Sequence, residues 1–537
     1  SVDINGQFTW SGGSLAGLGV LNSNAGAVIS GSSNIANKTA TFSGFTGWSP
    51  GSVINAGSSG TIVNAAGATF TNVGDSTFQY VLGGATPVFT NLGTFAKTGG
   101  TGTTLIGGAV FNTSGALDIQ IGTLSLTGGG ALGGTIAIAS GAMVRLGGGA
   151  FAATSGFSGG GALVFAGGST TFSAPSVFGN SSSSVTVSGG TAVFDALTTV
   201  SGSLSFSAGT IAGSDTLDLD GLFTWSGGGL VGAGILNANA GAMISGSEDI
   251  ANRTAVFNGA TVWADGSVIN GGSAGTLVNS ATGTFVNSGD ATYQYVLGGA
   301  TPVFTNLGTF AKSSGRGTTV FSGVTFNNSG TISVSSGTLS FTGAFNNSGG
   351  SLIAAGGNFS FSNALNVGTG TIGGFGTFTA PSITAGGLVL PGNSPGLLNI
   401  AGDLTLLGTA TTLFEIGGTS PGSTYDVINV SGTATLNGTL GLMFANGFES
   451  TVTGANTFTI LNAASLAGAF SNAANGSRLA TTDGFGSFQV NYSSAALTLS
   501  NFVPVPEPST WALLSCGLLL VFPAFRRRRA RENPETP

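Results

Sequence analysis

The chain has 537 residues, of which 97 are glycine, 41% are apolar and only 6% are charged. A disordered chain of such low charge would contain far fewer apolar residues, so the composition predicts an ordered protein. Up to Val503 the chain carries 16 acidic and 7 basic residues, a net charge of −9, which disfavours nucleic acid as a partner. Histidine is absent and the single cysteine is Cys516, so no disulfide and no His or Cys metal cage is expected before it. We therefore predict no cofactor.

Residues 1–215 and 216–385 are expected to form two copies of a long repeat. A shift of 215 positions aligns residues 6–115 with residues 221–330 without a gap. The alignment also superposes the tryptophans of the two copies, Trp10 on Trp225 and Trp48 on Trp263. The first residues, SVDIN, match the TLDLD that opens the second copy, so we expect the first copy to be truncated at its N-terminus.

A shorter repeat runs inside each copy, in which an apolar residue, asparagine and a Gly-containing turn recur about every 20 residues. Asn72, Asn91 and Asn112 stand 19 and 21 residues apart, and FNNSG at residues 326–330 returns at residues 345–349. Three short strands with their turns need about 20 residues, which is one rung of a parallel β-solenoid. The pattern predicts an all-β, right-handed parallel β-helix with asparagine ladders at its turns.

A string of antiparallel β-sandwiches is the competing interpretation, because alternating stretches such as residues 331–341 (TISVSSGTLSF) would serve either fold. The drifting rung length and the ungapped long repeat favour the solenoid. Residues 386–502 differ in texture and resemble the C-terminal passenger-like module of autotransporter-type and other large bacterial surface proteins. That resemblance implies a continuing or capping β module rather than a reaction.

Residues 503–537 have three parts whose order is informative. The first is the motif of Val505, Pro506, Glu507, Pro508, Ser509 and Thr510. The apolar run of residues 511–525 would span about 22 Å as a helix, short of a hydrocarbon core of about 30 Å, and predicts a minimal transmembrane helix. The third part is a basic cluster of Arg526, Arg527, Arg528 and Arg529. These arginines predict a membrane stop, with a cytoplasmic tail and everything before Val505 exported.

This order of motif, short membrane span and terminal arginine cluster resembles the PEP-CTERM sorting domain of bacterial exported proteins. The resemblance implies processing by an exosortase, a membrane-embedded cysteine transpeptidase. The protein would be anchored transiently in the inner membrane by a single C-terminal pass. Removal of the anchor would then pass the body to the cell surface or to the exopolysaccharide matrix.

Patterns that could carry catalysis are weak in this sequence. Glycine-rich matches to GxGxxG at residues 368–373 and to GxSxG at residues 271–275 and 392–396 arise easily by chance, and without histidine no Ser-His triad forms. Asp218 and Asp220 would share one strand face near Asp215, as an acidic pair of a polysaccharide-cleaving enzyme would. The first copy, however, has Asn5 in place of Asp220.

Other conspicuous residues favour structural roles. Ser33 and Asn34 of the first copy stand where the second has Glu248 and Asp249, so that acidic pair is not repeated. Asp75 and Asp290 persist in both copies, but each follows an Asn-x-Gly turn and is interpreted as a turn residue. The repeated tryptophans would stack on sugars if exposed, but a core role is favoured.

The sequence predicts a non-enzymatic structural or adhesive protein of the bacterial cell surface or biofilm matrix. Its partners would be the exosortase and exopolysaccharide. A β-helix polysaccharide lyase or hydrolase is the alternative. An autotransporter is disfavoured, because the C-terminus lacks the alternating strands of an outer-membrane barrel.

Overall fold

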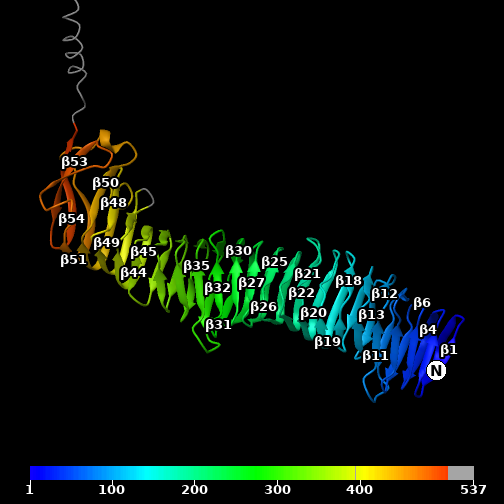
Figure 1. The fold of residues 1–537 in the computed structure, drawn as a ribbon. Coiled ribbons are helices and arrows are strands. Elements are labelled where there is room, and N and C mark those ends of the chain that lie inside the picture. Colours follow the sequence, from blue (N-terminus) through cyan, green and yellow to red (C-terminus); the bar gives the residue numbers. More distant parts are fainter. Residues whose placement is uncertain (393–394, 506–537) are drawn as a thin grey trace, which may run out of the picture. The chain divides into compact units, whose positions relative to one another are not determined.

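The computed structural model describes residues 1–392 and 395–505, and almost all of their regular structure is β-strand (Figure 1). The only helix in these residues is a single 3-10 turn, η1, at Phe448–Ser450. The chain divides into two compact units, Ser1–Gly387 and a second unit that begins at Leu388. Both copies of the long repeat lie in the first unit.

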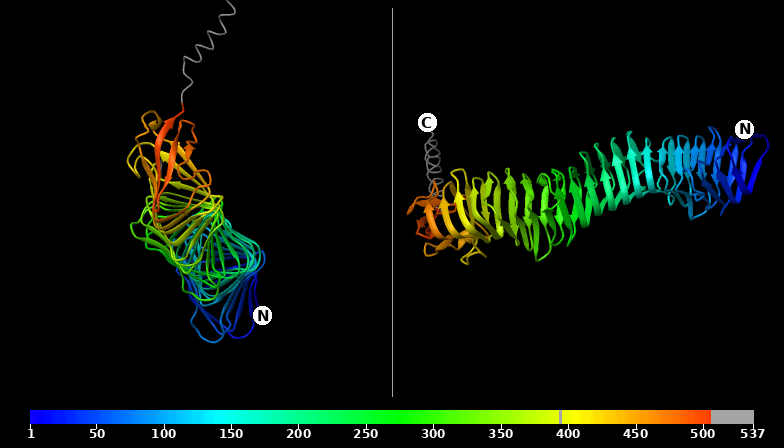
Figure 2. Two further views of the ribbon diagram at one scale, coloured as in Figure 1. Left: turned by 90° about the vertical axis from the view of Figure 1, so that its left-hand side faces the viewer. Right: turned by 90° about the horizontal axis from the view of Figure 1, so that it is seen from below.

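The first unit is a parallel β-solenoid, as the stacked rungs of Figures 1 and 2 show. Each strand pairs in parallel with the strand one rung further along the chain; for example, Val2 lies beside Leu21 and Thr77 beside Leu105. The prediction of a parallel solenoid is therefore confirmed for this unit, and the antiparallel sandwich is wrong. The strands form three ladders along the stack, here named A, B and C.

Ladder A is interrupted once. Its first part comprises β6 (Phe45–Trp48), β9 (Thr69–Asn72), β12 (Thr94–Lys97), β15 (Ala116–Ile119) and β18 (Thr135–Ile138), preceded by the first halves of β2 (Phe8–Ala16) and β4 (Ala27–Ala36). Its second part comprises β21 (Ser176–Phe178), β23 (Thr198–Val200), β25 (Leu217–Leu219), β27 (Ile235–Ala238), β29 (Thr254–Phe257), β32 (Thr276–Asn279), β35 (Val303–Asn306), β38 (Thr325–Asn328) and β41 (Phe345–Asn347).

Ladder B begins with the second halves of β2 and β4 and continues without a break. It comprises β7 (Val53–Gly57), β10 (Thr77–Tyr80), β13 (Thr103–Gly107) and β16 (Thr123–Leu126), then the first halves of β19 (Met143–Ala153), β20 (Ala162–Phe172), β22 (Ser184–Phe194), β24 (Ser203–Ala212), β26 (Phe223–Val231) and β28 (Ala242–Ala251). It ends with β30 (Ala260–Trp263), β33 (Thr284–Asn287), β36 (Thr309–Lys312), β39 (Thr331–Val334), β42 (Ser351–Ala355) and β45 (Thr371–Ala385).

Ladder C is also continuous. It comprises β1 (Val2–Ile4), β3 (Val20–Ser23), β5 (Thr39–Phe42), β8 (Thr61–Asn64), β11 (Val88–Asn91), β14 (Val110–Thr113) and β17 (Gly130–Leu132), then the second halves of the long strands β19 to β28. It continues through β31 (Val268–Gly272), β34 (Thr292–Tyr295), β37 (Thr318–Ser322), β40 (Thr338–Phe341) and β43 (Asn358–Phe361), while β44 (Leu365–Gly368) pairs with the end of β45.

The long strands cross a corner of the solenoid, where the backbones of successive rungs come very close. Gly168 and Gly190 occupy this corner with positive φ angles of 67° and 68°. A Cβ atom on Gly168 would collide with the carbonyl oxygen of Gly149, so no larger residue fits. Stacked glycines therefore allow one strand to serve two faces of a rung.

Apolar side chains of alternating residues fill the inside of the solenoid. Phenylalanines of successive rungs stack: the rings of Phe70 and Phe95 are 5.8 Å apart and those of Phe304 and Phe326 are 4.9 Å apart. All four of these side chains are buried. Period-two alternation puts these residues inward, while threonine, serine and asparagine occupy many of the outward positions.

Buried asparagines form ladders, as predicted, but only part of the predicted register is correct. The pairing of Phe326 with Phe345 is confirmed. The expected register of Asn72 with Asn91 is wrong, because Asn72 ends a strand of ladder A and Asn91 a strand of ladder C. Asn64 instead donates to Asn91 at 2.6 Å.

The second copy has the longer asparagine ladder. Asn279 donates to Asn306 at 2.7 Å, Asn306 to Asn328 at 2.8 Å and Asn328 to Asn347 at 2.8 Å.

The two copies of the repeat are offset around the axis of the solenoid. Ten rungs of ladder C separate β11 from β34. The counterpart of β34 in the first copy, however, is β10, which belongs to ladder B. A shift of 215 residues thus equals ten rungs and one further face, so equivalent strands of the two copies lie on different ladders.

The second unit begins as a parallel structure and ends as an antiparallel one. Its parallel strands are β46 (Leu388–Pro391), β47 (Leu397–Leu406), β48 (Thr411–Ile416), β49 (Val427–Leu436), β50 (Thr439–Phe444) and β51 (Phe458–Gly468). Strand β51 pairs antiparallel with β54 (Ala496–Pro504), which pairs with β53 (Gly486–Tyr492) and then β52 (Arg478–Ala480).

The transmembrane helix expected at residues 511–525 lies outside the described residues. Within residues 1–392 and 395–505, no helix has the length and apolar character needed to cross a membrane.

Candidate functional site

Most of the expected sorting site lies beyond the part of the chain that the structure describes. Val505 is the last described residue, and its N–H donates to the carbonyl oxygen of Phe485 at 2.9 Å. Its side chain is 57% exposed. Pro506, Glu507, Pro508, Ser509 and Thr510 follow it, and they and Arg526 to Arg529 are outside the described residues.

The acidic residues considered as a catalytic pair, and judged structural, lie in hydrogen-bonded surface ladders. Asp218 accepts a hydrogen bond from Asn237 at 2.7 Å, and Asp220 accepts one from Asn239 at 3.0 Å. Each partner stands on the next rung of ladder A.

The first copy keeps these ladders without keeping both charges. Asn22 donates to Asp3 at 2.6 Å and Asn24 donates to Asn5 at 2.7 Å. An amide therefore replaces the carboxylate of Asp220 in the same hydrogen bond, which indicates that bridging rungs, rather than negative charge, is the shared property of this position.

Asp75 and its counterpart Asp290 are ion-paired with buried lysines. Lys97 is fully buried, and its Nζ donates to Asp75 Oδ1 at 2.8 Å and to the carbonyl oxygens of Gly74 at 3.1 Å and Gly99 at 3.0 Å. The hydrogen bond from Lys97 lowers the pKa of Asp75 below its ordinary value. Three oxygens thus surround the ammonium group, one for each of its N–H donors.

The second copy reproduces this arrangement. Lys312 Nζ donates to Asp290 Oδ1 at 2.8 Å and to the carbonyl oxygens of Gly289 at 2.6 Å and Ser314 at 3.0 Å. The interpretation of Asp75 and Asp290 as turn residues missed these partners. The sequence could have predicted a buried Lys97, because Lys97 follows Phe95 by two residues and both therefore point inward.

Glu248 is a buried acid that occurs only in the second copy. Neither of its carboxyl oxygens has a hydrogen-bond partner among the described residues. Burial, together with the neighbouring charge of Asp249, raises the pKa of Glu248 to about 8. The counterpart Ser33 is also buried, and its hydroxyl also lacks a partner in the described chain. Glu248 and Ile250 are alternate residues of β28 and both point inward, so the period-two pattern could have predicted that Glu248 is buried.

Two further buried ionisable groups were not predicted. Arg253 donates from Nη1 to the carbonyl oxygen of Val231 at 3.1 Å, and burial lowers its pKa to about 10. Asp426, in the second unit, accepts from the N–H groups of Gly396 and Glu415, both at 2.7 Å. Through these two hydrogen bonds, Asp426 ties the loop at Gly396 to β48. Burial raises the pKa of Asp426 to about 7.

The four repeated tryptophans, which were considered for sugar stacking, are core residues. Trp10 is 3% exposed, Trp263 1%, and Trp48 and Trp225 are fully buried. Sugar stacking on these rings is therefore excluded, and the favoured core interpretation is confirmed.

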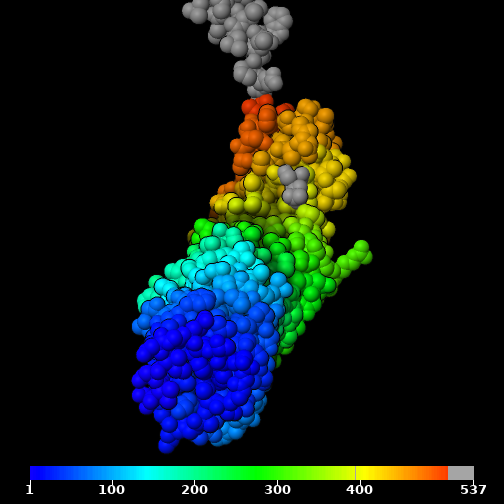
Figure 3. Space-filling model, turned by 90° about the vertical axis from the view of Figure 1, so that its right-hand side faces the viewer, coloured from blue at the N-terminus to red at the C-terminus, as the bar shows by residue number. Residues whose placement is uncertain are grey.

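Two identical loops project from the solenoid. Each follows the repeated Gln-Tyr pair and exposes two aliphatic side chains, which are Val81 and Leu82 in the first copy and Val296 and Leu297 in the second. The second loop forms the green arm at the side of Figure 3.

Left-handed turns support these loops from the preceding rung. Ser58 and Ser273, both with φ of 46°, donate their N–H groups to Gly83 and Gly298 at 2.7 Å. The GxSxG match at residues 271–275 is therefore such a supporting turn.

No group of three or more Asp, Glu, Cys or His side chains that could hold a metal ion occurs in residues 1–392 and 395–505. The fold and these contacts define a parallel β-solenoid protein with internal polar ties. No protein-family model matches the chain, and no curated protein matches it.

Proposed function

We propose that this chain is an exported structural or adhesive scaffold of a bacterial cell surface or biofilm matrix. The observation that carries the proposal is the uninterrupted course of ladders B and C along the first unit. With a spacing of about 4.8 Å between rungs, the strands from β2 to β45 extend on the order of 80 Å. Such a stack is suited to act as a stiff spacer, because each rung is held by its neighbours on both sides.

Sorting through the C-terminal signal is the second part of the proposal. Val505 is exposed directly before Pro506, so the motif begins at a point that is accessible on the second unit. An exosortase would cleave there, after a helix at residues 511–525 and the stop at Arg526 to Arg529 had held the protein in the inner membrane. The solenoid is proposed to wind right-handed, as parallel crossovers usually do.

The arrangement of the acids supports a scaffold over a polysaccharide lyase or hydrolase. Asp218 and Asp220 each bond to an asparagine of the next rung, and an amide substitutes for Asp220 in the first copy. We expect no release of reducing or unsaturated ends from acidic polysaccharides. Reproducible turnover that Asp218→Asn abolishes would overturn this part of the proposal.

The sorting proposal is tested by changing the motif in the native host. Replacing Pro506, Glu507 and Pro508 with alanine should leave uncleaved protein in the inner-membrane fraction, because the motif loses the restriction that proline places on the backbone. A matched control replaces Pro534, Glu535 and Thr536, which follow the arginines and have similar composition. Equal surface display of the two variants would refute sorting through this motif.

A further inference from the structure

Ladder A lacks a strand between β18 and β21. In the rung between them, Ser158 forms an isolated bridge with Ala137, and Phe157 forms one with Phe178. Residues 154–156, which precede the bridges, belong to no strand. The ladder is therefore held by single bridges at this one rung.

The interruption leaves main-chain polar groups unpaired. The N–H and C=O groups of Ser155 and Gly156 make no hydrogen bond to any residue in the described ranges. The hydroxyl groups of Thr135 and Ser155 also make no hydrogen bond to a described residue, whereas the Ser158 hydroxyl donates to the carbonyl oxygen of Ile136 at 3.3 Å. Polar groups of this kind are available to a ligand, or else are left to water.

A surface hollow of about 370 Å³ lies at the same place. This volume falls within the range of about 300–1,000 Å³ found for small-molecule sites. Its lining combines the hydroxyl-bearing residues Thr135, Ser155 and Ser158 with the apolar residues Ile136, Phe157 and Val177. Glycines complete the lining; a Cβ atom on Gly156 would collide with the carbonyl oxygen of Val177.

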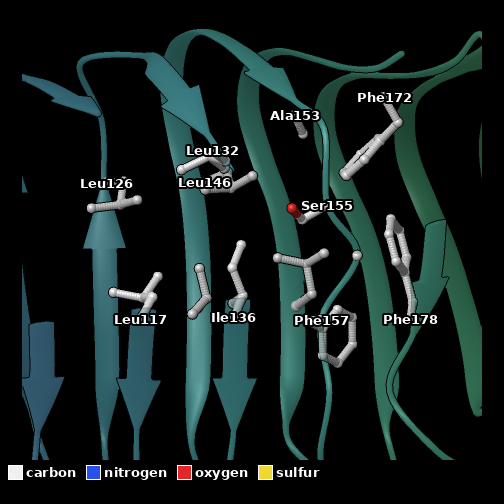
Figure 4. Close-up of a pocket in the computed structure, with 13 residues that line it drawn as sticks. Leu117, Leu126, Leu132, Ile136, Leu146, Ala153, Ser155, Phe157, Phe172 and Phe178 are labelled. Atoms are coloured by element: carbon white, nitrogen blue, oxygen red, sulfur yellow. The ribbon is translucent and has the colours of Figure 1, made fainter. Parts of the chain in front are cut away.

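The core beneath the hollow is also incompletely filled. A cavity of about 20 Å³ lies inside the solenoid and is lined almost entirely by apolar side chains (Figure 4). Ile136, Ser155, Gly156 and Phe157 line both the cavity and the surface hollow. The wall between the two spaces is thus formed by Ile136 of β18 and by the segment from Ser155 to Phe157, which belongs to no strand.

The lining selects the chemical class of the ligand. It contains no ionisable side chain, and the body carries a net negative charge, so an anionic polymer is disfavoured. Apolar side chains match the C–H faces of a sugar ring, while hydroxyl and main-chain groups match its hydroxyls. We propose that this hollow, at the gap between β18 and β21, binds a short segment of a neutral oligosaccharide. The inference rests on the proposed function, since it names a ligand for the scaffold.

The test uses the full chain and ligand-observed NMR or calorimetry with defined probes. These are cellotetraose, laminaritetraose, maltotetraose and isomaltotetraose, with tetragalacturonate as the charged comparison and a peptide of residues 331–341 as the strand-like comparison. We expect saturable binding of at least one neutral tetrasaccharide and none of tetragalacturonate. No binding of any neutral probe, or tighter binding of the peptide, would overturn the proposal.

Two variants locate the binding. Thr135→Trp fills the hollow from an exposed position and should weaken binding at least tenfold, while Ser155→Ala should weaken it by about threefold through loss of one hydrogen bond. The control is Thr309→Trp. Thr94 lies in line with Thr135 along ladder A, because both pair with Ala116. Thr309 is the second-copy counterpart of Thr94 and is also exposed.

Unchanged binding in both hollow variants would place the ligand elsewhere and contradict the proposal. The result is independent of sorting, because cleavage at the C-terminal motif does not involve the hollow. A failure of one proposal is thus distinguishable from a failure of the other.

Discussion

The two copies of the long repeat form the same strands but present them on different faces of the solenoid. In the first copy the strand before the projecting loop, β10, belongs to ladder B, whereas its counterpart β34 belongs to ladder C. A duplication that shifts the sequence by one face is accommodated, because every face is built from the same short strands. What both copies keep must therefore depend on neighbouring rungs, not on a particular face.

The conserved and the changed positions differ in the way they are tied to those rungs. Lys97 and Lys312 keep all three oxygen partners, each from a turn nearby in the stack. In contrast, Ser33 and Glu248 have no side-chain partner among the described residues, and this position differs between the copies. At these two positions, the residue with inter-rung polar contacts is kept and the buried residue without a side-chain partner is not.

The largest expected effect concerns the buried ion pairs. Asp75→Asn and Asp290→Asn should each destabilise the surrounding rungs by about 4 kcal/mol, because a fully buried ammonium group loses its counter-charge. Native-state hydrogen exchange of amides in β12 and β36 measures the loss locally, which suits a solenoid that need not unfold in one step. Asp118→Asn, at a surface aspartate that accepts from Gln120, is the control. A clear loss in only one copy would contradict the equivalence of the two ion pairs.

The second prediction is that the stability of the second copy, but not of the first, depends on pH through Glu248. The pKa of Glu248 is about 8 in the folded chain against an ordinary 4.5, so the folded state binds more protons between these values. The stability of the rungs around β28 should be highest below pH 4.5 and should fall as the pH rises through 8, by about 3 kcal/mol between pH 5 and pH 8. Exchange protection of β28, corrected for intrinsic rates, should show this fall, while β4 of the first copy should not.

Glu248→Ser introduces the residue of the first copy and serves as the control. It should remove the pH dependence of protection in β28. A pH dependence that persists in this variant would show that another group causes it.

A smaller effect is expected where the copies differ by a single hydroxyl. Tyr293 is fully buried and donates to the carbonyl oxygen of Gly275 at 3.3 Å, and its counterpart in the first copy is Phe78. Tyr293→Phe should cost about 1 kcal/mol in local exchange protection, the usual contribution of one hydrogen bond. The reciprocal Phe78→Tyr should fold normally, because Gly60 stands where Gly275 accepts. Failure of Phe78→Tyr to fold would show that the two interiors differ more than the repeat suggests.

Much of the fold was predictable, because period-two alternation and repeat length are local properties. The pairing of residues 326–330 with residues 345–349 followed from an unbroken spacing of 19 residues. The register of Asn91 did not, because the projecting loop lengthens its rung, so that its partner Asn64 is 27 residues away. Counting residues finds the register only where no loop interrupts the rung.

The candidate sites were less predictable than the fold. The inward phase of Lys97 and Glu248 was present in the sequence. The oxygen partners of Lys97, however, lie in turns of the stack, and the lack of any partner for Glu248 is visible only in the folded chain. The hollow at Ser155 arises from the lack of a strand, and a glycine-rich stretch does not distinguish such a gap from an ordinary turn. Surface sites of a solenoid are set by departures from its repeat, which local patterns do not describe.

The most direct test of the account is the C-terminal mass of the protein recovered from the surface of its native host. Intact-mass or C-terminal peptide analysis should give a chain that ends near Pro506 to Ser509 and lacks Trp511 to Arg531, because an exosortase would have removed the anchor. Surface protein that retains Arg526 to Pro537 would contradict the account and leave only a simple membrane anchor.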